Sequence, residues 1–185
     1  MHQISVLSRM IAQLQRTLDV YEGLFLRVQD AKIIMESFNE IGDTLKRSLS
    51  THIIIGCAAI FSDSDKTCGH ENMSLKNIIS KHQHNFSEET KQLYNDIILL
   101  VDEMNLKNYR NKHVGHFGLD ESLGNKQVKR DITTTNTRKL LESSQILLND
   151  IINDSSLLPK GHIVAYYTPI PQRRAPQRFL EKLKL

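Results

Sequence analysis

Several features that mark other protein classes are scarce in this sequence of 185 residues. It has two cysteines, Cys57 in an apolar run and Cys68 in a polar loop, too few for the disulfide framework of a small secreted domain. Its longest strongly apolar stretch, residues 53–61, is about half of the roughly 20 residues that a membrane-spanning helix needs. The first ten residues lack the pattern of a secretory signal. We therefore expect a soluble cytoplasmic protein with reduced thiols and no membrane partner.

Several motifs of catalysis and metal binding are absent too. The sequence has no glycine-rich phosphate loop and no Gly-x-Ser-x-Gly element, which argues against a nucleoside triphosphatase and against a serine hydrolase of that type. Histidines occur in pairs, His82 with His84 and His113 with His116, but no cysteines or carboxylates follow at the intervals of zinc sites. We expect neither a metal nor another cofactor. The formal net charge of +3 neither requires nor opposes a nucleic-acid partner.

Apolar residues are present at helical spacing, most regularly near the N-terminus. Their separations alternate between three and four residues at Ile4, Leu7, Ile11, Leu14, Leu18, Tyr21, Phe25 and Val28. This heptad pattern predicts one long helix over residues 1–41, with a possible break near 39–42. We expect its apolar stripe to pack inside its own bundle. A dimer contact is the alternative.

Capping residues and apolar faces predict further helices. Asp43 can begin a second helix, Ser74 a short third one, and Ser87 a fourth that should reach about Lys112. A last core helix is expected over residues 136–153. Together these patterns predict an all-α helical bundle.

All four prolines lie after residue 158, and this change in composition predicts a boundary. We expect a helical domain over residues 1–155, with its core at about 43–155, and an irregular, proline-containing basic tail over 156–185. The end of this tail, 178–185, could form a short basic helix. The tail could follow an RNA backbone, although a solvated flexible segment is the simpler interpretation.

Residues 109–118 concentrate the groups that cleave phosphodiesters. RNA carries its own nucleophile, the 2′-hydroxyl, so an enzyme needs an imidazole for proton transfer and a fixed cation for the phosphorane. Arg110 and His116 are the candidates for these roles, and Asn111 could position either the phosphate or the imidazole. The neighbours that could support them are Tyr109, Lys112 and His113.

Helical geometry sets a condition on this pair. On a regular helix, residues six apart point roughly 120° away from each other and are separated by about 9 Å of rise. Arg110 and His116 therefore converge only if the helix breaks near Gly115 or if a second subunit contributes to the site. The alternative is that both are polar groups at a helix end, where cations are favoured.

The same segment resembles the signature of the HEPN superfamily, which is an arginine, a polar residue after it, and a histidine four to six residues beyond the arginine. Here five residues separate Arg110 from His116, and Asn111 occupies the polar position. Gly115 resembles the small residue that is common before the histidine.

Residues upstream of the motif are similar to one branch of this superfamily, named after a phage abortive-infection protein. That branch tends to have a Phe-Asp pair at the end of one helix and Ser-Leu at the start of the next. Phe61 and Asp63 resemble the pair, with Ser62 between them, and Ser74 and Leu75 resemble the start.

The resemblance implies a metal-independent endoribonuclease of toxin–antitoxin or phage-defence systems. It also implies a homodimer with facing motifs, an RNA substrate and an antitoxin partner. Some HEPN toxins carry a modified tyrosine two residues after the histidine, and Gly118 takes that position here. Two alternatives stay open: a non-catalytic HEPN-like helical module that binds RNA or a protein partner, and a dimerisation module built on the heptad stripe.

Overall fold

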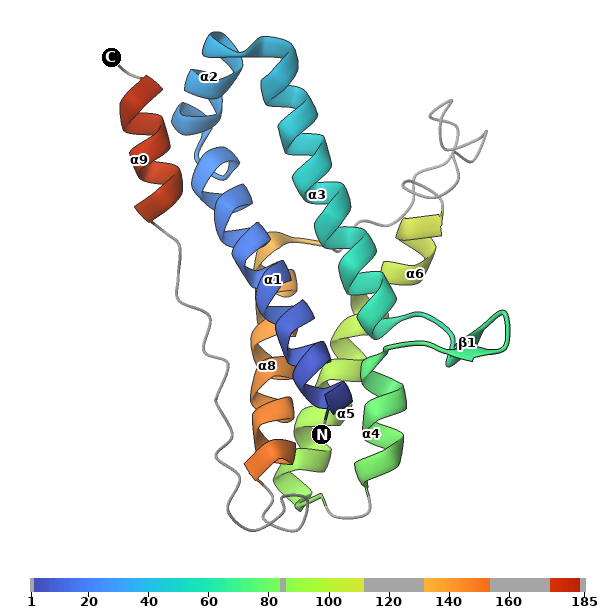
Figure 1. The fold of residues 1–185 in the computed structure, drawn as a ribbon. Coiled ribbons are helices and arrows are strands. Elements are labelled where there is room, and N and C mark those ends of the chain that lie inside the picture. Colours follow the sequence, from blue (N-terminus) through green and yellow to red (C-terminus); the bar gives the residue numbers. More distant parts are fainter. Residues whose placement is uncertain (1, 84–85, 112–131, 154–173, 184–185) are drawn as a thin grey trace.

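The computed structural model describes residues 2–83, 86–111, 132–153 and 174–183. This part of the chain is mostly helical, which confirms the predicted all-α class (Figure 1). Its helices are α1 (His2–Phe25), α2 (Val28–Ser37), α3 (Asn39–Phe61), α4 (Leu75–His82), α5 (Glu88–Met104), α6 (Leu106–Tyr109), α8 (Thr134–Asn153) and α9 (Arg174–Leu183). Strands β1 (Lys66–Thr67) and β2 (His70–Glu71) form one small antiparallel hairpin.

The apolar stripe of α1 forms the centre of the core. Helix α1 packs against α3 and α8, and α5 packs against α8. The stripe residues in the first five turns are at most 4% exposed, namely Ile4, Leu7, Ile11, Leu14 and Leu18. The interpretation that the stripe packs inside its own bundle is therefore confirmed. Because these side chains are already covered, the stripe does not serve as a dimer contact.

The prediction of a single N-terminal helix over residues 1–41 is wrong. Helix α1 ends at Phe25, α2 begins three residues later at Val28, and the chain reverses at Phe38 before α3 (Figure 1). The apolar spacing continues across both breaks but no longer marks one face, since Val28 and Ile41 are exposed. The buried residues of this region, Leu24, Phe25 and Ile34, pack with Leu180 in a separate cluster of α1, α2 and α9.

The proposed helix start at Asp43 is also wrong, whereas the two serine caps are confirmed. Helix α3 begins at Asn39, so Asp43 lies inside it and pairs with Arg47 one turn later, at 2.7 Å. Ser74 accepts a hydrogen bond from the backbone N–H of Asn77, at 3.3 Å. Ser87 likewise accepts a hydrogen bond from the backbone N–H of Thr90, at 3.2 Å. Glu88 and Glu89 lie in the first turn of α5, where the helix dipole favours acids.

The polar segment after α3, predicted to be a loop, contains the hairpin. Cys68 and Gly69 form its tip with positive φ angles of 50° and 82°. The Asn72 side-chain amide donates to the Ser64 carbonyl at 2.7 Å and to the Thr67 hydroxyl at 2.8 Å. These bonds hold the base of a hairpin whose paired strands are only two residues long.

The basic C-terminal stretch is a docked helix, not an irregular tail, over residues 174–183. Helix α9 packs on α1 and α2 and buries Leu180. A Cβ atom on Gly23 would lie 2.6 Å from the Cβ of Pro176, so the glycine permits this close approach. The possible strand at 163–168 lies outside the described residues. None of the described helices is long and apolar enough to cross a membrane.

Burial of the α1 stripe predicts that it stabilises the monomer. Leu18→Ala should lower the free energy of unfolding by about 2–5 kcal/mol, because the substitution leaves a cavity in the core. Leu26→Ala, at a residue that is 58% exposed, should change it by less than about 0.5 kcal/mol. Urea denaturation at several protein concentrations measures both. A loss at Leu18 that disappears at high protein concentration would mean that the stripe is an interface after all.

The two thiols should differ in reactivity. Burial raises the pKa of Cys57 to about 12, while Cys68 is exposed at the hairpin tip. Because the thiolate is the reactive form, an alkylating reagent at pH 8 should label Cys68 and leave Cys57 unlabelled until the protein unfolds. Mass spectrometry of native and urea-treated protein gives the result, and rapid native labelling of Cys57 would contradict it.

Candidate functional site

The structure describes part of the predicted catalytic segment. Tyr109 ends α6, and Arg110 and Asn111 follow it with helical geometry. The other predicted site residues, Lys112, His113 and His116, lie outside the described residues, as do Gly115 and Gly118.

A break in the helix decides where Arg110 lies. The helix predicted to run from Glu88 to about Lys112 ends instead at Met104, and Asn105 adopts a left-handed conformation with φ 50° and ψ 38°. Asparagine tolerates this conformation better than most residues. The chain then begins α6, whose first residue, Leu106, is buried. In Figure 1, α6 lies on the same side of the bundle as the hairpin.

The new direction brings Arg110 to the C-terminal end of α3. Its Nη1 forms an ion pair with Oδ1 of Asp63, a residue 47 positions earlier in the chain. Its Nε and Nη2 both donate to Oδ1 of Asn111, at 3.1 and 2.9 Å. The two charged side chains are 23% and 27% exposed, so the pair is partly shielded from water.

These contacts fix the guanidinium and leave part of it free to bind a ligand. An arginine has five N–H donors. Three of those on Arg110, one on each nitrogen, already form a hydrogen bond or ion pair. Two donors consequently have no partner among the described residues. A planar, permanently charged group with spare donors suits an oxyanion such as a phosphate.

The upstream residues that resemble the abortive-infection branch meet at this place. Phe61 is the last residue of α3, and Asp63 follows it in the turn that leaves the helix. Ser74 caps α4, and Leu75 is its first residue. The sequence pattern marks Asp63 only as a landmark and does not predict its contact with Arg110. No local pattern reveals a pair so distant in the chain.

A cavity of about 460 Å³ adjoins the ion pair. Its apolar wall consists of Phe61, Leu75, Ile98, Val101 and Leu106. Its polar lining includes Asp63, Asp65 and Asp102 from the turn after α3 and from the end of α5. The Ser62 hydroxyl, in the same lining, is buried and has no hydrogen-bond partner among the described residues. The volume falls in the range of about 300–1,000 Å³ that is usual for small-molecule sites.

The other histidines and carboxylates of the described residues do not form a metal site. The ranges that the structure describes contain no cluster of three or more His, Cys, Asp or Glu side chains placed to hold a metal ion. His82 lies in the last turn of α4, where burial and then nearby positive charge, including that of Lys81, lower its pKa.

Comparisons with protein-family models, with curated proteins and with solved structures found no match to this chain. The HEPN assignment is therefore a proposal that rests on the residues described above.

The ion pair predicts a measurable coupling between Asp63 and Arg110. Asp63→Ala should lower the free energy of unfolding by about 1 kcal/mol, because it leaves a partly buried cation without its carboxylate. The double variant with Asp63→Ala and Arg110→Ala should lose less unfolding free energy than the two single variants lose in total. Asp43→Ala, which breaks the more exposed pair with Arg47, is the matched control and should cost less than about 0.5 kcal/mol. Strict additivity of the two changes in urea denaturation would contradict the coupling.

Proposed function

We propose that this chain is a HEPN-type endoribonuclease that cleaves single-stranded RNA without a metal ion. The observation that supports this most is the fixed guanidinium of Arg110, held by Asp63 and Asn111 beside a cavity and with donors to spare. Arginine in this state can bind a phosphate and stabilise the extra negative charge of the transition state.

In the proposed reaction, the 2′-hydroxyl of the substrate attacks the adjacent phosphorus. The bond from phosphorus to the 2′-oxygen forms, and the bond to the 5′-oxygen of the next nucleotide breaks. The 2′-hydroxyl gives up its proton and the leaving oxygen gains one, with His116 carrying at least one of these transfers. The products are a 2′,3′-cyclic phosphate and a 5′-hydroxyl. Arg110 stabilises the negative charge on the phosphorane.

The proposed active form is a homodimer whose two motifs share one cleft. Each site would combine Arg110 of one subunit with His116 of the other. The two residues would then not have to converge within one regular helix, on which they point apart. The stripe on α1 is buried within the monomer, so the dimer contact must lie on another surface. A role as a toxin or phage-defence effector, with an antitoxin as partner, rests on the family resemblance alone.

The runner-up is a non-catalytic HEPN-like module that binds RNA or a protein partner at the same place. The contact between Arg110 and Asp63 favours this alternative, because a carboxylate beside the guanidinium neutralises much of its charge. In this case the arginine would organise a binding surface and would contribute nothing to chemistry.

Cleavage of single-stranded RNA by the purified protein tests the proposal. Arg110→Ala and His116→Ala should each reduce the cleavage rate at least about a hundredfold, because each removes a group that acts in the transition state. Arg110→Lys should restore only part of the loss, since lysine keeps the charge without the forked donors. Arg47→Ala, at an exposed arginine on α3, should retain the wild-type rate.

The outcomes separate the two candidates. Cyclic phosphate ends on the products, unchanged rates in a chelator and unchanged helical content by circular dichroism are expected for the nuclease. Cleavage that persists in both alanine variants, or that stops when a chelator is added, would overturn the mechanism. RNA binding in a gel shift without any cleavage would favour the binding module.

A further inference from the structure

The cavity beside Asp63 has a lining that suits one particular ligand. We propose that it is the base-binding subsite of the nuclease, that it takes guanine, and that Asp102 is the residue that recognises the base. This inference rests on the proposed function, because it gives that site its substrate preference.

The volume of the cavity and the apolar residues of its lining suit a nucleobase. The cavity lies between the end of α3, the start of α4 and the junction of α5 with α6. Leu75, Val101 and Leu106 on its wall are all buried core residues. Flat, apolar faces are what a heterocyclic base offers, and single-stranded RNA leaves its bases free to enter such a slot. Asp63 belongs both to this lining and to the ion pair, so the cavity borders the partner of Arg110.

Among the carboxylates of the lining, Asp102 is the one available to a ligand. Asp63 pairs with Arg110, and Asp65 pairs with Lys76 at 3.2 Å. The side chain of Asp102 is exposed and has no hydrogen-bond or ion-pair partner in the part of the chain that the structure describes.

A free carboxylate distinguishes guanine from the other bases of RNA. The Watson–Crick edge of guanine presents two adjacent donors, the ring N1–H and the 2-amino group, and a carboxylate can accept one hydrogen bond on each oxygen. Adenine and cytosine present an amino group beside an unprotonated ring nitrogen, whose lone pair would face the second oxygen. Uracil presents only one donor. Charge complementarity thus selects guanine.

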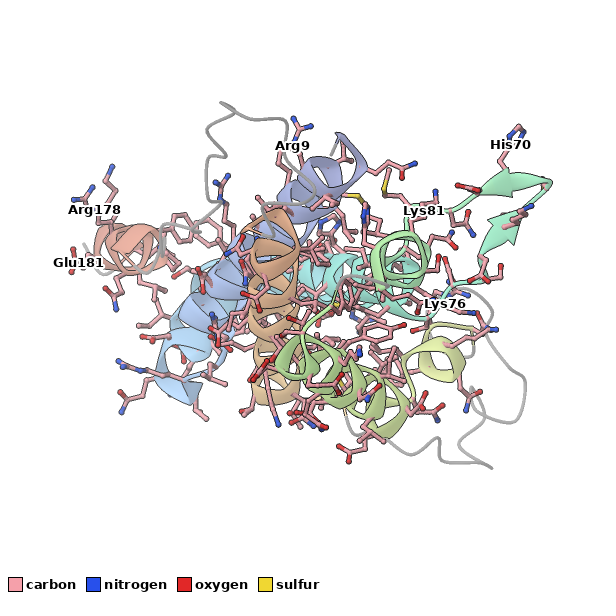
Figure 2. The ribbon with its side chains drawn as sticks, turned by 90° about the horizontal axis from the view of Figure 1, so that it is seen from below. Arg9, His70, Lys76, Lys81, Arg178 and Glu181 are labelled. Atoms are coloured by element: carbon pink, nitrogen blue, oxygen red, sulfur yellow. The ribbon has the colours of Figure 1, made fainter. Side chains whose placement is uncertain are left out.

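Lysines beside the slot suit the phosphates that accompany a base. Lys76 and Lys107 both line the cavity, from α4 and α6. Figure 2 shows Lys76 on the side of the bundle that carries the hairpin and α6. Lys107 is exposed and has no ion-pair partner among the described residues. Cations at this edge would attract the backbone of a bound RNA strand.

Replacing guanosine by inosine tests the assignment, because inosine lacks only the 2-amino group. Two single-stranded RNAs should be compared that differ at one position, guanosine or inosine, in an otherwise uridine-rich chain. Wild-type protein should cut beside guanosine about tenfold faster than beside inosine, the loss expected for one charge-assisted hydrogen bond. In Asp102→Asn the ratio should fall to about one, because the carboxamide no longer offers two acceptors.

Glu103→Gln is the matched control. Glu103 is an exposed acid in the same helical turn but does not line the cavity, so this variant should keep the wild-type ratio. Equilibrium dialysis with guanosine and inosine monophosphates provides a readout that does not depend on cleavage. Wild-type protein should bind the guanosine nucleotide about tenfold more tightly, and Asp102→Asn should bind both equally.

The results distinguish failure of the subsite from failure of the nuclease. Cleavage with equal rates beside guanosine and inosine in the wild type would overturn the guanine subsite and leave the nuclease standing. Selective binding of guanosine monophosphate without any RNA cleavage would support the subsite and overturn the nuclease. A preference for guanosine that survives in Asp102→Asn would overturn the role of Asp102. Neither binding nor cleavage would overturn both proposals.

Discussion

The candidate site depends on one backbone constraint, the left-handed conformation of Asn105. A helix that continued from α5 without a break would carry Arg110 along the axis of α5. The reversal of φ at Asn105 instead ends α5 and starts α6 in a new direction, with Leu106 anchored in the core. That change brings the guanidinium of Arg110 to Asp63 at the end of α3. The same junction supplies Asp102 and Leu106 to the cavity, so the conformation of Asn105 positions both the arginine and part of the cavity lining.

The apolar packing of the bundle is centred on α1. Burial of the α1 stripe between α3 and α8 supplies the apolar contacts that hold the bundle together. The turn after α3 and the hairpin lie outside that packing and are held mainly by polar contacts, while α6 is anchored by the buried Leu106. Among the polar contacts, the Asn77 side-chain amide donates to the carbonyl of Asp65, and Lys76 pairs with the carboxylate of Asp65. A surface fixed by polar bonds keeps charged groups in place where a ligand can reach them.

Sequence patterns predicted the parts of the fold that depend on local chemistry. The apolar face of α5 and the caps at Ser74 and Ser87 follow from hydrogen bonding and burial within a few residues. Sequence patterns did not predict the breaks after Phe25 and at Asn105. Helical spacing can continue across a turn when the next segment has its own apolar contacts. The pair of Asp63 with Arg110 was equally hidden, since it requires two distant segments to be placed first. Sequence identified Arg110 as a candidate, and only the fold shows what surrounds it.

The surroundings of Arg110 restrict how a phosphate can bind there. Asp63 occupies one of the terminal nitrogens, and a phosphate brought to that nitrogen would meet the carboxylate as a like charge. Asn111 holds the edge formed by Nε and Nη2 with a neutral oxygen, which orients the guanidinium without adding a second negative charge. An acid at residue 111 would enclose the arginine between two carboxylates and cancel the charge that a substrate needs. A polar but uncharged residue after the arginine would therefore suit the proposed phosphate binding, because it fixes the guanidinium in place and keeps its remaining donors attractive to an anion.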